Sequence, residues 1–340
     1  MLSKKFKAQV KRIATSTVLA VSTVAVLFGM GANLDSIVNT VREGIARING
    51  NEIKAENVVD VIKDSNGISI KVNAEDSTGI RKIEVLQGST SVEVHNYDGS
   101  KTEVEQAISV SVPFGETKTF TVKVNGNTIK QQEITNMRCI STAQDLVNFR
   151  NLVNDGNTFE GMYVELVNDI DLSSICSSTV GNWSPIGNNN KSFKGIFNGN
   201  FYKLENLYYK GNNWRFICLF YSITGVVENL LLVNPYIYNT YYQQNQETTS
   251  NGIVRYVPKG AVLRNCATIG GSVTTISNCT RDGSYWPFPE ATGLAGYVEG
   301  TIENCYNSAN ITAYSYTNDY NVQSHAGGIA GQLARRSFNE

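Results

Sequence analysis

Alternating apolar and polar residues dominate the chain between residues 53 and 135. Five runs share this alternation: GISIKV (67–72), RKIEVL (81–86), TSVEVH (90–95), ISVSV (108–112) and TFTVKV (119–124). Turn-forming pairs such as Asp98-Gly99 and Asn125-Gly126 separate the runs. Short alternating strands with Gly, Asn and Asp between them are typical of a β-sandwich. We therefore expect residues 53–135 to form one sandwich domain.

A second pattern, a repeat, begins after residue 137. Three segments align with one another: VVENLLL (226–232), AVLRNCAT (261–268) and TIENCYN (301–307). Each follows a strand of small residues with a glycine turn, and each precedes a variable excursion and a third β-rich piece. Short strands stacked at a nearly constant period predict a parallel β-helix with three strands per repeat. The expected fold class is therefore all-β, a sandwich followed by a solenoid over residues 137–340.

The aligned segments place the same residue types at one corner of each repeat. Asn229, Asn265 and Asn304 are suited to a left-handed corner, and their amides can hydrogen-bond from one repeat to the next as a ladder. Cys266 and Cys305 follow two of these asparagines, at the interior position that Leu230 occupies in the first copy. This favours buried free thiols, with a disulfide or a metal-binding or catalytic role as alternatives.

The start of the solenoid needs a cover, because an open end exposes unpaired backbone. Residues 140–153 predict an amphipathic cap helix, with Leu146, Phe149 and Leu152 or Val153 on one face. Ser141 and Gln144 have the spacing of a capping box. At the other end, a fourth copy begins at 327–331 and stops nine residues later. The solenoid is thus expected to be incomplete at its C-terminal end, where further repeats or a partner would finish the last coil.

Residues 1–32 have the parts of an export signal. A basic stretch with Lys4, Lys5, Lys7, Lys11 and Arg12 precedes an uncharged run at 13–30, and Gly31 and Ala32 follow. The run is long enough to act as a membrane tether if it is not cleaved, so both a signal peptide and a signal anchor remain open. Residues 33–52 are expected to form a linker helix.

Several of these motifs together resemble a known family. The stretch at 140–173, WSPIG (183–187) and FKGIFNGNFYKLENL (193–207) resemble the opening of GLUG-motif surface proteins. Their Gly-Leu-x-Gly element matches residues 293–296 and 328–331, and is degraded at 218–221 and 252–255. This resemblance implies a right-handed parallel β-helix on a secreted or surface-bound bacterial protein. Residues 74–85 and 112–126 likewise resemble bacterial immunoglobulin-like modules, here without cysteine.

Charge and motifs narrow the function. The chain has 29 basic and 30 acidic residues, a net charge of −1, which argues against a nucleic-acid binder. It has no HExxH motif and no nucleophile motif, so we expect a non-catalytic protein without a cofactor. Asp169 and Asp171 are a weak candidate for a calcium site or an acid/base pair. A turn in which both carboxylates accept backbone hydrogen bonds is the favoured interpretation.

Aromatic residues give the clearest indication of function. Sixteen of the 17 tyrosines lie after residue 137, and many fall in the excursions. The candidate binding residues are Tyr236, Tyr238, Tyr241, Tyr242, Tyr285, Trp286, Tyr314 and Tyr316. Exposed aromatics beside Asn and Gln are typical of sugar- and protein-binding surfaces. Aromatic stacking that only shields the loops and the edges of the coils is the alternative interpretation.

Together these patterns predict an adhesin-like protein, secreted or on the cell surface, that binds glycans or proteins through loops of the β-helix. Two alternatives remain open. One is a carbohydrate-active β-helix enzyme, a polysaccharide lyase or hydrolase. The other is an architectural stalk of a larger surface protein, such as an immunoglobulin-cleaving protease.

The basic and uncharged segments generate a testable prediction. Residues 1–32 fused to an export reporter should carry the reporter out of the bacterial cytoplasm, because five cations precede an uncharged run. Reporter activity outside the cytoplasmic membrane is the measurement. Intact fusion retained in the cytoplasm would contradict the prediction.

Overall fold

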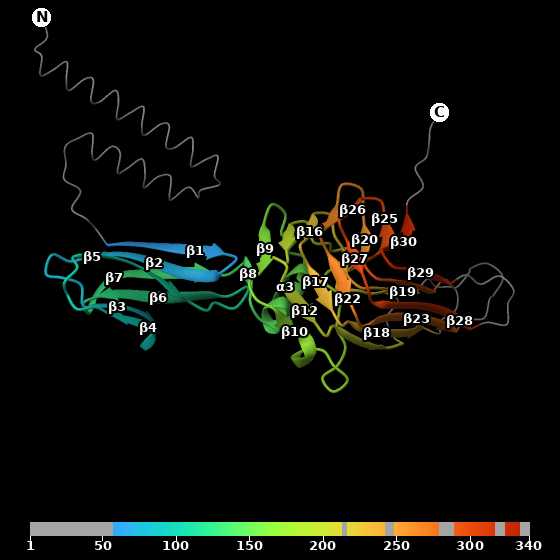
Figure 1. Cartoon of the computed structure of the whole chain (residues 1–340), viewed down its shortest axis with the longest axis horizontal. Coiled ribbons are helices and arrows are strands. Elements are labelled where there is room, and N and C mark those ends of the chain that lie inside the picture. The colour runs from blue at the N-terminus through green and yellow to red at the C-terminus, as the bar shows by residue number, and fades with distance from the viewer. Residues whose placement is uncertain (1–56, 213–215, 242–247, 279–288, 317–323, 334–340) are drawn as a thin grey trace, which may run out of the picture.

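The computed structural model describes residues 57–212, 216–241, 248–278, 289–316 and 324–333. The fold is all-β, with many parallel sheets and, among the described residues, one α-helix. Figure 1 shows an N-terminal region of antiparallel strands beside a larger region of stacked parallel strands. The export segment at 1–32 and the helix expected at 33–52 lie outside the described residues. Within the described ranges, no helix is long and apolar enough to cross a membrane.

Seven strands build the N-terminal region, from residue 58 to residue 135. They are β1 (Val58–Asp64), β2 (Gly67–Glu75), β3 (Lys82–Gln87), β4 (Thr90–Asn96), β5 (Glu103–Ser109), β6 (Thr117–Val124) and β7 (Asn127–Thr135). Two antiparallel sheets result, in the orders β1-β2-β5 and β4-β3-β6-β7. The alternation seen in the sequence decides which side chains face inward: Ile68, Ile70 and Val72 of β2 are buried, and the residues between them are not.

The repeat region begins with three short strands and the helix. These are β8 (Cys139–Ile140), α3 (Ala143–Asp155), β9 (Tyr163–Leu166) and β10 (Ile170–Asp171). Four repeats of five strands follow. The first holds β11 (Ile196–Asn198), β12 (Lys203–Glu205), β13 (Tyr208–Gly211), β14 (Phe216–Ile217) and β15 (Phe220–Ser222). The second holds β16 (Val226–Glu228), β17 (Leu231–Val233), β18 (Tyr236–Tyr241), β19 (Thr248–Asn251) and β20 (Val254–Val257).

The last two repeats have the same five strands. The third holds β21 (Val262–Arg264), β22 (Ala267–Ile269), β23 (Ser272–Asn278), β24 (Pro289–Thr292) and β25 (Ala295–Val298). The fourth holds β26 (Thr301–Glu303), β27 (Tyr306–Asn307), β28 (Asn310–Tyr316), β29 (His325–Gly327) and β30 (Ala330–Leu333). The expectation of three strands per repeat was therefore wrong. Each excursion returns through a fourth strand (β14, β19, β24 or β29) before the fifth begins.

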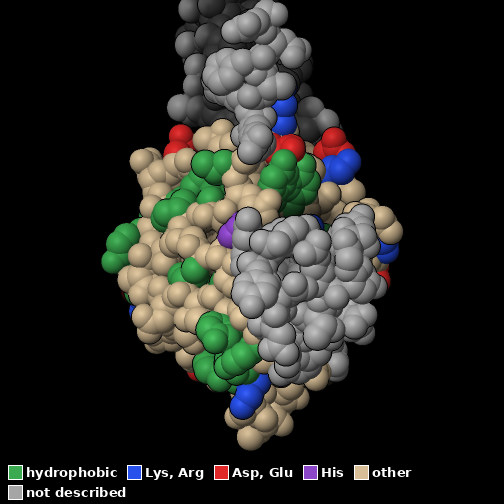
Figure 2. Space-filling view, turned by 90° about the vertical axis from the view of Figure 1, so that its right-hand side faces the viewer, with side chains coloured by type: hydrophobic (Ala, Val, Ile, Leu, Met, Phe, Trp, Pro, Cys, Tyr) green, Lys and Arg blue, Asp and Glu red, His purple; other side chains and the backbone are tan. Residues whose placement is uncertain are grey.

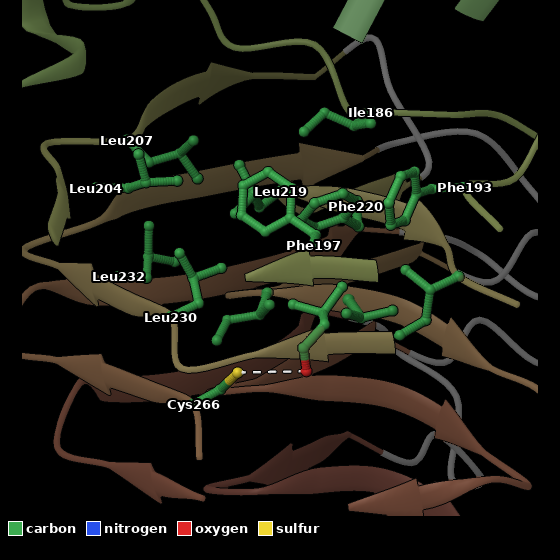
Figure 3. Close-up of a cluster of buried hydrophobic side chains, with 14 of the residues drawn as sticks. Ile186, Phe193, Phe197, Leu204, Leu207, Leu219, Phe220, Leu230, Leu232 and Cys266 are labelled. Atoms are coloured by element: carbon green, nitrogen blue, oxygen red, sulfur yellow. Dashed lines mark hydrogen bonds between the residues drawn. The ribbon is translucent and has the colours of Figure 1, made fainter. Parts of the chain in front are cut away.

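Each strand of a repeat pairs in parallel with the same strand of the next repeat. Five parallel sheets result, and the third, for example, has the order β13-β18-β23-β28. The register keeps equivalent residues in line, as in Phe197↔Val227 and Val227↔Leu263. Apolar side chains therefore stack inside the repeats as one continuous core, part of which Figure 3 shows.

Helix α3 covers the first end of this core. Its buried face carries Leu146, Phe149 and Val153, as the sequence predicts. The capping box is different from the expected Ser141–Gln144 pair: Thr142 is the N-cap, and Asp145 is its partner. The carboxylate of Asp145 is buried and accepts hydrogen bonds from the Ser141 and Thr142 backbone nitrogens, both at 3.0 Å. Gln144 points outward instead and bonds Asn148.

Phe149 lies at the centre of the junction between the two regions. Its ring centroid is 5.0 to 6.5 Å from five other phenylalanine rings, those of Phe114, Phe159, Phe193, Phe197 and Phe220. Phe114 comes from the N-terminal region, and its backbone N–H donates to Asp145 at 2.8 Å. Conversely, Cys139 and Val167 of the repeat region pack into the core of the N-terminal region. Each region thus places side chains in the core of the other.

The last repeat is the most exposed part of the described stack. Among the described residues, no strand pairs with the outer edges of β26 to β30. Several large apolar side chains here are solvent-exposed: Tyr306, Tyr314, Tyr316, Ile329 and Leu333. An unpaired edge of this kind is a template for a further strand.

The junction gives a second prediction. Asp145→Asn should lower the free energy of unfolding by about 2–4 kcal/mol, because the carboxylate accepts four hydrogen bonds and an amide cannot replace it. Asp155→Asn, an exposed change in the last turn of the same helix, should stay within about 0.5 kcal/mol of the parent. Urea unfolding of both variants is the measurement. Equal stability of the two variants would contradict the assignment of Asp145.

Candidate functional site

The three corner asparagines lie in one line along the stack. All have left-handed backbones, with φ of 53° at Asn229, 53° at Asn265 and 51° at Asn304. The Nδ2 of Asn265 donates to Oδ1 of Asn229 at 2.9 Å, and Asn304 donates to Asn265 at 3.3 Å. Asn229 donates in turn to Asn198 at 3.0 Å. The amides form a ladder that holds the corners of successive repeats in register.

The thiols next to the ladder differ in their surroundings. Cys266 is buried beneath Leu230, as Figure 3 shows, whereas Cys305 is only half-buried. Cys305 has the same register position as Cys266 and packs against the same core, but it is less buried because no described strand covers the outer side of the last repeat. Neither thiol is in a disulfide in this structure.

Asp169 and Asp171 lie at a strand end. Asp169 accepts a hydrogen bond from the Lys203 backbone at 2.9 Å. Asp171 caps the 3₁₀ turn η1 (Leu172–Ser174) and also accepts from Asn206 at 2.9 Å, contacts that lower its carboxyl pKa. In the described ranges, His, Cys, Asp and Glu do not gather in threes at a metal-binding distance.

Four candidate tyrosines lie on one surface, the outward side of the sheet β13-β18-β23-β28. They are Tyr236 and Tyr238 on β18, and Tyr314 and Tyr316 on β28. These residues lie in strands rather than in the loops that the sequence pattern predicts for them. Tyr241 ends β18, and its side chain is not described; Tyr242, Tyr285 and Trp286 lie outside the described residues. We call this outward surface of the sheet the tyrosine face.

Two pairs of rings occupy opposite corners of the tyrosine face. Tyr236 stacks on Tyr208 of the preceding repeat, with centroids 5.4 Å apart and planes 13° from parallel. Tyr314 and Tyr316 meet edge to face, with centroids 4.4 Å apart. Tyr208 was missing from the sequence candidates because its repeat was not aligned with the other three.

The outward residues between the two pairs are nearly all uncharged. The register places Ser272, Thr274 and Thr312 on the same outward side of the sheet. Among the residues of β13, β18, β23 and β28, the outward-facing charged residue is Lys210. Figure 2, an end view of the molecule, shows separate hydrophobic patches among other uncharged side chains and backbone, with the Lys, Arg, Asp and Glu side chains toward the edges of the view. Aromatic rings with hydroxyl groups between them can pack against the C–H faces of a sugar and bond its hydroxyls.

A second aromatic cluster lies on the sheet β15-β20-β25-β30. Tyr256 and Tyr297 are paired in register, with ring centroids 5.5 Å apart. Both hydroxyls donate to the Glu299 carboxylate, at 2.9 and 3.2 Å, and burial together with this carboxylate raises the pKa of each tyrosine. The aligned segments GIVRYV and GLAGYV already place both tyrosines at the same position, so the sequence contained the signal for this pair although neither tyrosine was a candidate.

The last glycines of the Gly-Leu-x-Gly elements make room for a buried carboxylate. A β-carbon on Gly331 would lie 2.4 Å from Cδ of Glu290, and one on Gly296 would lie 3.1 Å from its Oε1. Glu290 is almost wholly buried and accepts a hydrogen bond from Gln332 at 2.9 Å. The first two repeats have Tyr221 and Arg255 at the glycine's place. There the Arg255 guanidinium lies 3.7 Å from the centroid of the Phe216 ring.

The structure also has a cavity of about 370 Å³ at the edge of the N-terminal region, between β1 and β7. Its two cations already have partners. Lys63 donates to the Thr135 carbonyl at 2.6 Å, and Arg138 pairs with Glu165 at 2.6 Å. The tyrosine face is therefore the better candidate for binding.

The asparagine ladder generates a third prediction. Asn265→Gly should cost about 1–2 kcal/mol, since it removes two ladder bonds but tolerates the left-handed corner. Asn265→Ala should cost about 1 kcal/mol more, because alanine is strained at positive φ. The free energies of unfolding of both variants test this. A glycine variant as stable as the parent would show that the amide ladder does not stabilise the stack.

Comparison with known proteins gives partial matches. No family model matches the chain. A protein of Evansella cellulosilytica that carries the name Gly-rich membrane protein is 37% identical over 100 residues, which are 29% of this chain and 11% of that protein. A Bacteroides ovatus crystal structure that carries the name immunoglobulin A1 protease is 20% identical, with a TM-score of 0.35, over 58% of this chain and 62% of that one. Each of these proteins is thus similar to this chain over part of its length.

Proposed function

We propose that this chain is an exported, non-catalytic surface protein that binds a glycan on the tyrosine face. In this proposal the N-terminal region is an immunoglobulin-like sandwich, and the repeats are a right-handed parallel β-helix of the GLUG type. The uncharged run at 13–30 brings the protein to the cell surface, either as a cleaved signal or as a tether.

Topology supports the architecture. Seven strands in two antiparallel sheets around one core are the number and arrangement of an immunoglobulin-like module. A β-helix requires parallel sheets to which each repeat contributes one strand, and the repeat region has five such sheets. Connections between parallel strands are right-handed in almost all proteins, which favours that hand here.

One observation carries the binding proposal: two pairs of rings share one nearly uncharged sheet face. From Tyr236 to Tyr314 the register spans two strand spacings and four residues, a distance of roughly 16 Å. That distance suits an oligosaccharide chain rather than a single sugar. The hydroxyls of Ser272, Thr274 and Thr312, which share the outward side with Ile276 and Asn310, supply hydrogen-bond partners between the rings without the charge that an ionic protein partner would need.

The experiment that tests this function uses the full chain and insoluble polysaccharides. Cellulose, chitin, xylan and peptidoglycan are each incubated with the protein, and the bound fraction is measured after centrifugation. At least one should bind, and Tyr236→Ala with Tyr314→Ala should weaken that binding at least tenfold, since each ring contributes about 0.5–1.5 kcal/mol beyond its buried area.

The matched control is Tyr306→Ala. Tyr306 is 60% exposed but lies on β27, which belongs to another sheet, so its loss should leave the affinity unchanged. Equal weakening by both variants, or no binding to any of the four polysaccharides, would contradict the proposal.

A further inference from the structure

Cys266 and Cys305 lie directly opposite one another in adjacent repeats. The register pairs Arg264 with Glu303 before them and Ala267 with Tyr306 after them, so the two cysteines share one place. Their thiols also have the same orientation. Each lies near the carbonyl oxygen two residues earlier, at 3.1 Å from Arg264 and 3.2 Å from Glu303.

This arrangement is compatible with a disulfide. Adjacent strands lie about 4.8 Å apart, within the roughly 4.4–6.8 Å that separate the Cα atoms of bonded cysteines. Besides their contact with each other, both thiols make weak S–H···O interactions with backbone carbonyls, such as the one of 3.7 Å from Cys266 to the Val227 carbonyl, the dashed line in Figure 3. In-register Cβ atoms are also about 4.8 Å apart, slightly more than the roughly 3.5–4.5 Å of bonded cysteines, so closure combines rotation about χ1 with a small approach of the two strands.

The two thiols differ in access and in acidity. Cys305 is half-buried, and a hydrogen bond from the Cys266 thiol is the main cause that lowers its pKa to about 7. Cys266 is 1% exposed, and burial raises its pKa well above the usual value. Cys305 thus has the properties of an attacking thiolate, and Cys266 those of a resolving thiol.

We propose that Cys305 and Cys266 form a thiol-oxidation site that reacts with small-molecule disulfides and closes into a bond between the last two repeats. The Cys305 thiolate attacks one sulfur of the small disulfide, whose S–S bond breaks and releases one thiolate. Cys266 then attacks the Cys305 sulfur, and its proton passes to the second leaving sulfur, which departs as a thiol. The two cysteines lose two electrons, and the small disulfide gains them.

The buried thiols elsewhere do not have this reactivity. Burial raises the pKa of Cys139 to about 11 and that of Cys218 to about 12, so neither provides a useful fraction of thiolate near pH 7. Cys176 is also buried, and its pKa is raised by desolvation. They serve as internal controls in the same folded chain.

The new bond would tie the most exposed repeat to the one before it. The outer edge of the last repeat has no described partner, so fraying should begin there. A disulfide between β21–β22 and β26–β27 prevents that opening at the corner. Amide exchange in residues 301–307 of the oxidised chain should therefore be slower than in the reduced chain.

The test is disulfide mapping of the full chain. Reduced protein is incubated with glutathione disulfide, free thiols are blocked, and tryptic peptides are analysed by mass spectrometry without a reductant. Because trypsin leaves Cys266 and Cys279 in one peptide, between Arg264 and Arg281, the experiment uses a Cys279→Ser background. We expect a linked pair of peptides that contain Cys266 and Cys305, and unmodified Cys218.

Single variants separate the two steps. Cys266→Val should leave a stable glutathione adduct on Cys305, and Cys305→Ser should leave Cys266 unmodified. Alkylation of Cys305 by iodoacetamide should be half-maximal near pH 7 rather than near 9.0. A glutathione adduct that persists on Cys305 while Cys266 is present, or no reaction at Cys305, would overturn the proposal. None of these readouts depends on glycan binding.

Discussion

In-register stacking of parallel strands is the constraint on which the repeat region depends. Each residue lies about 4.8 Å from its counterparts in the repeats before and after it, so one repeat cannot turn at a different place from its neighbours. The corner asparagines keep the turns aligned in two ways. Their backbones adopt the left-handed conformation of the turn, and their side-chain amides hydrogen-bond from one repeat to the next. Core side chains, corner asparagines and outward-facing residues are therefore all repeated at this spacing of about 4.8 Å.

The junction of the two regions solves a different problem, the open first end of the stack. Helix α3 covers it, and the Asp145 carboxylate fixes both the helix start and the Phe114 backbone. Since Phe114 packs in the repeat core while Cys139 and Val167 pack in the N-terminal core, separating the regions would expose apolar surface on both. A rigid connection follows, in which the N-terminal region acts as part of the cap.

The sequence predicted those features that rest on periodicity. Alternation located the N-terminal strands, and the spacing of Asn229, Asn265 and Asn304 located the corner ladder. It could not locate features that depend on tertiary contacts. Return strands β19 and β24 have no alternation because both of their faces are buried, and so they were not separated from the excursions.

Competition between neighbouring side chains also escaped the sequence. Gln144 and Asp145 both stand near the helix start, and the shorter carboxylate became the capping partner because it reaches the Ser141 and Thr142 nitrogens. Cys305 was assigned by analogy with Cys266, although burial of a stacked residue needs a strand on each side. The tyrosines were assigned to loops because strands β18 and β28 extend further into the excursions than the aligned segments do.

The carboxylate of Glu290 has a consequence for how this chain could be lengthened. When a repeat has glutamate at the position of Glu290, the repeat after it needs glycine where its backbone contacts that carboxylate, as at Gly331. The third repeat carries both residues, Glu290 and Gly296, so copies of it are compatible with one another in tandem. The first and second repeats have Tyr221 and Arg255 at the position of this glycine. Neither could follow the third repeat without a clash between that side chain and the Glu290 carboxylate. Growth of the stack by gene duplication or by design is therefore directional, with the third repeat as the unit that can be multiplied.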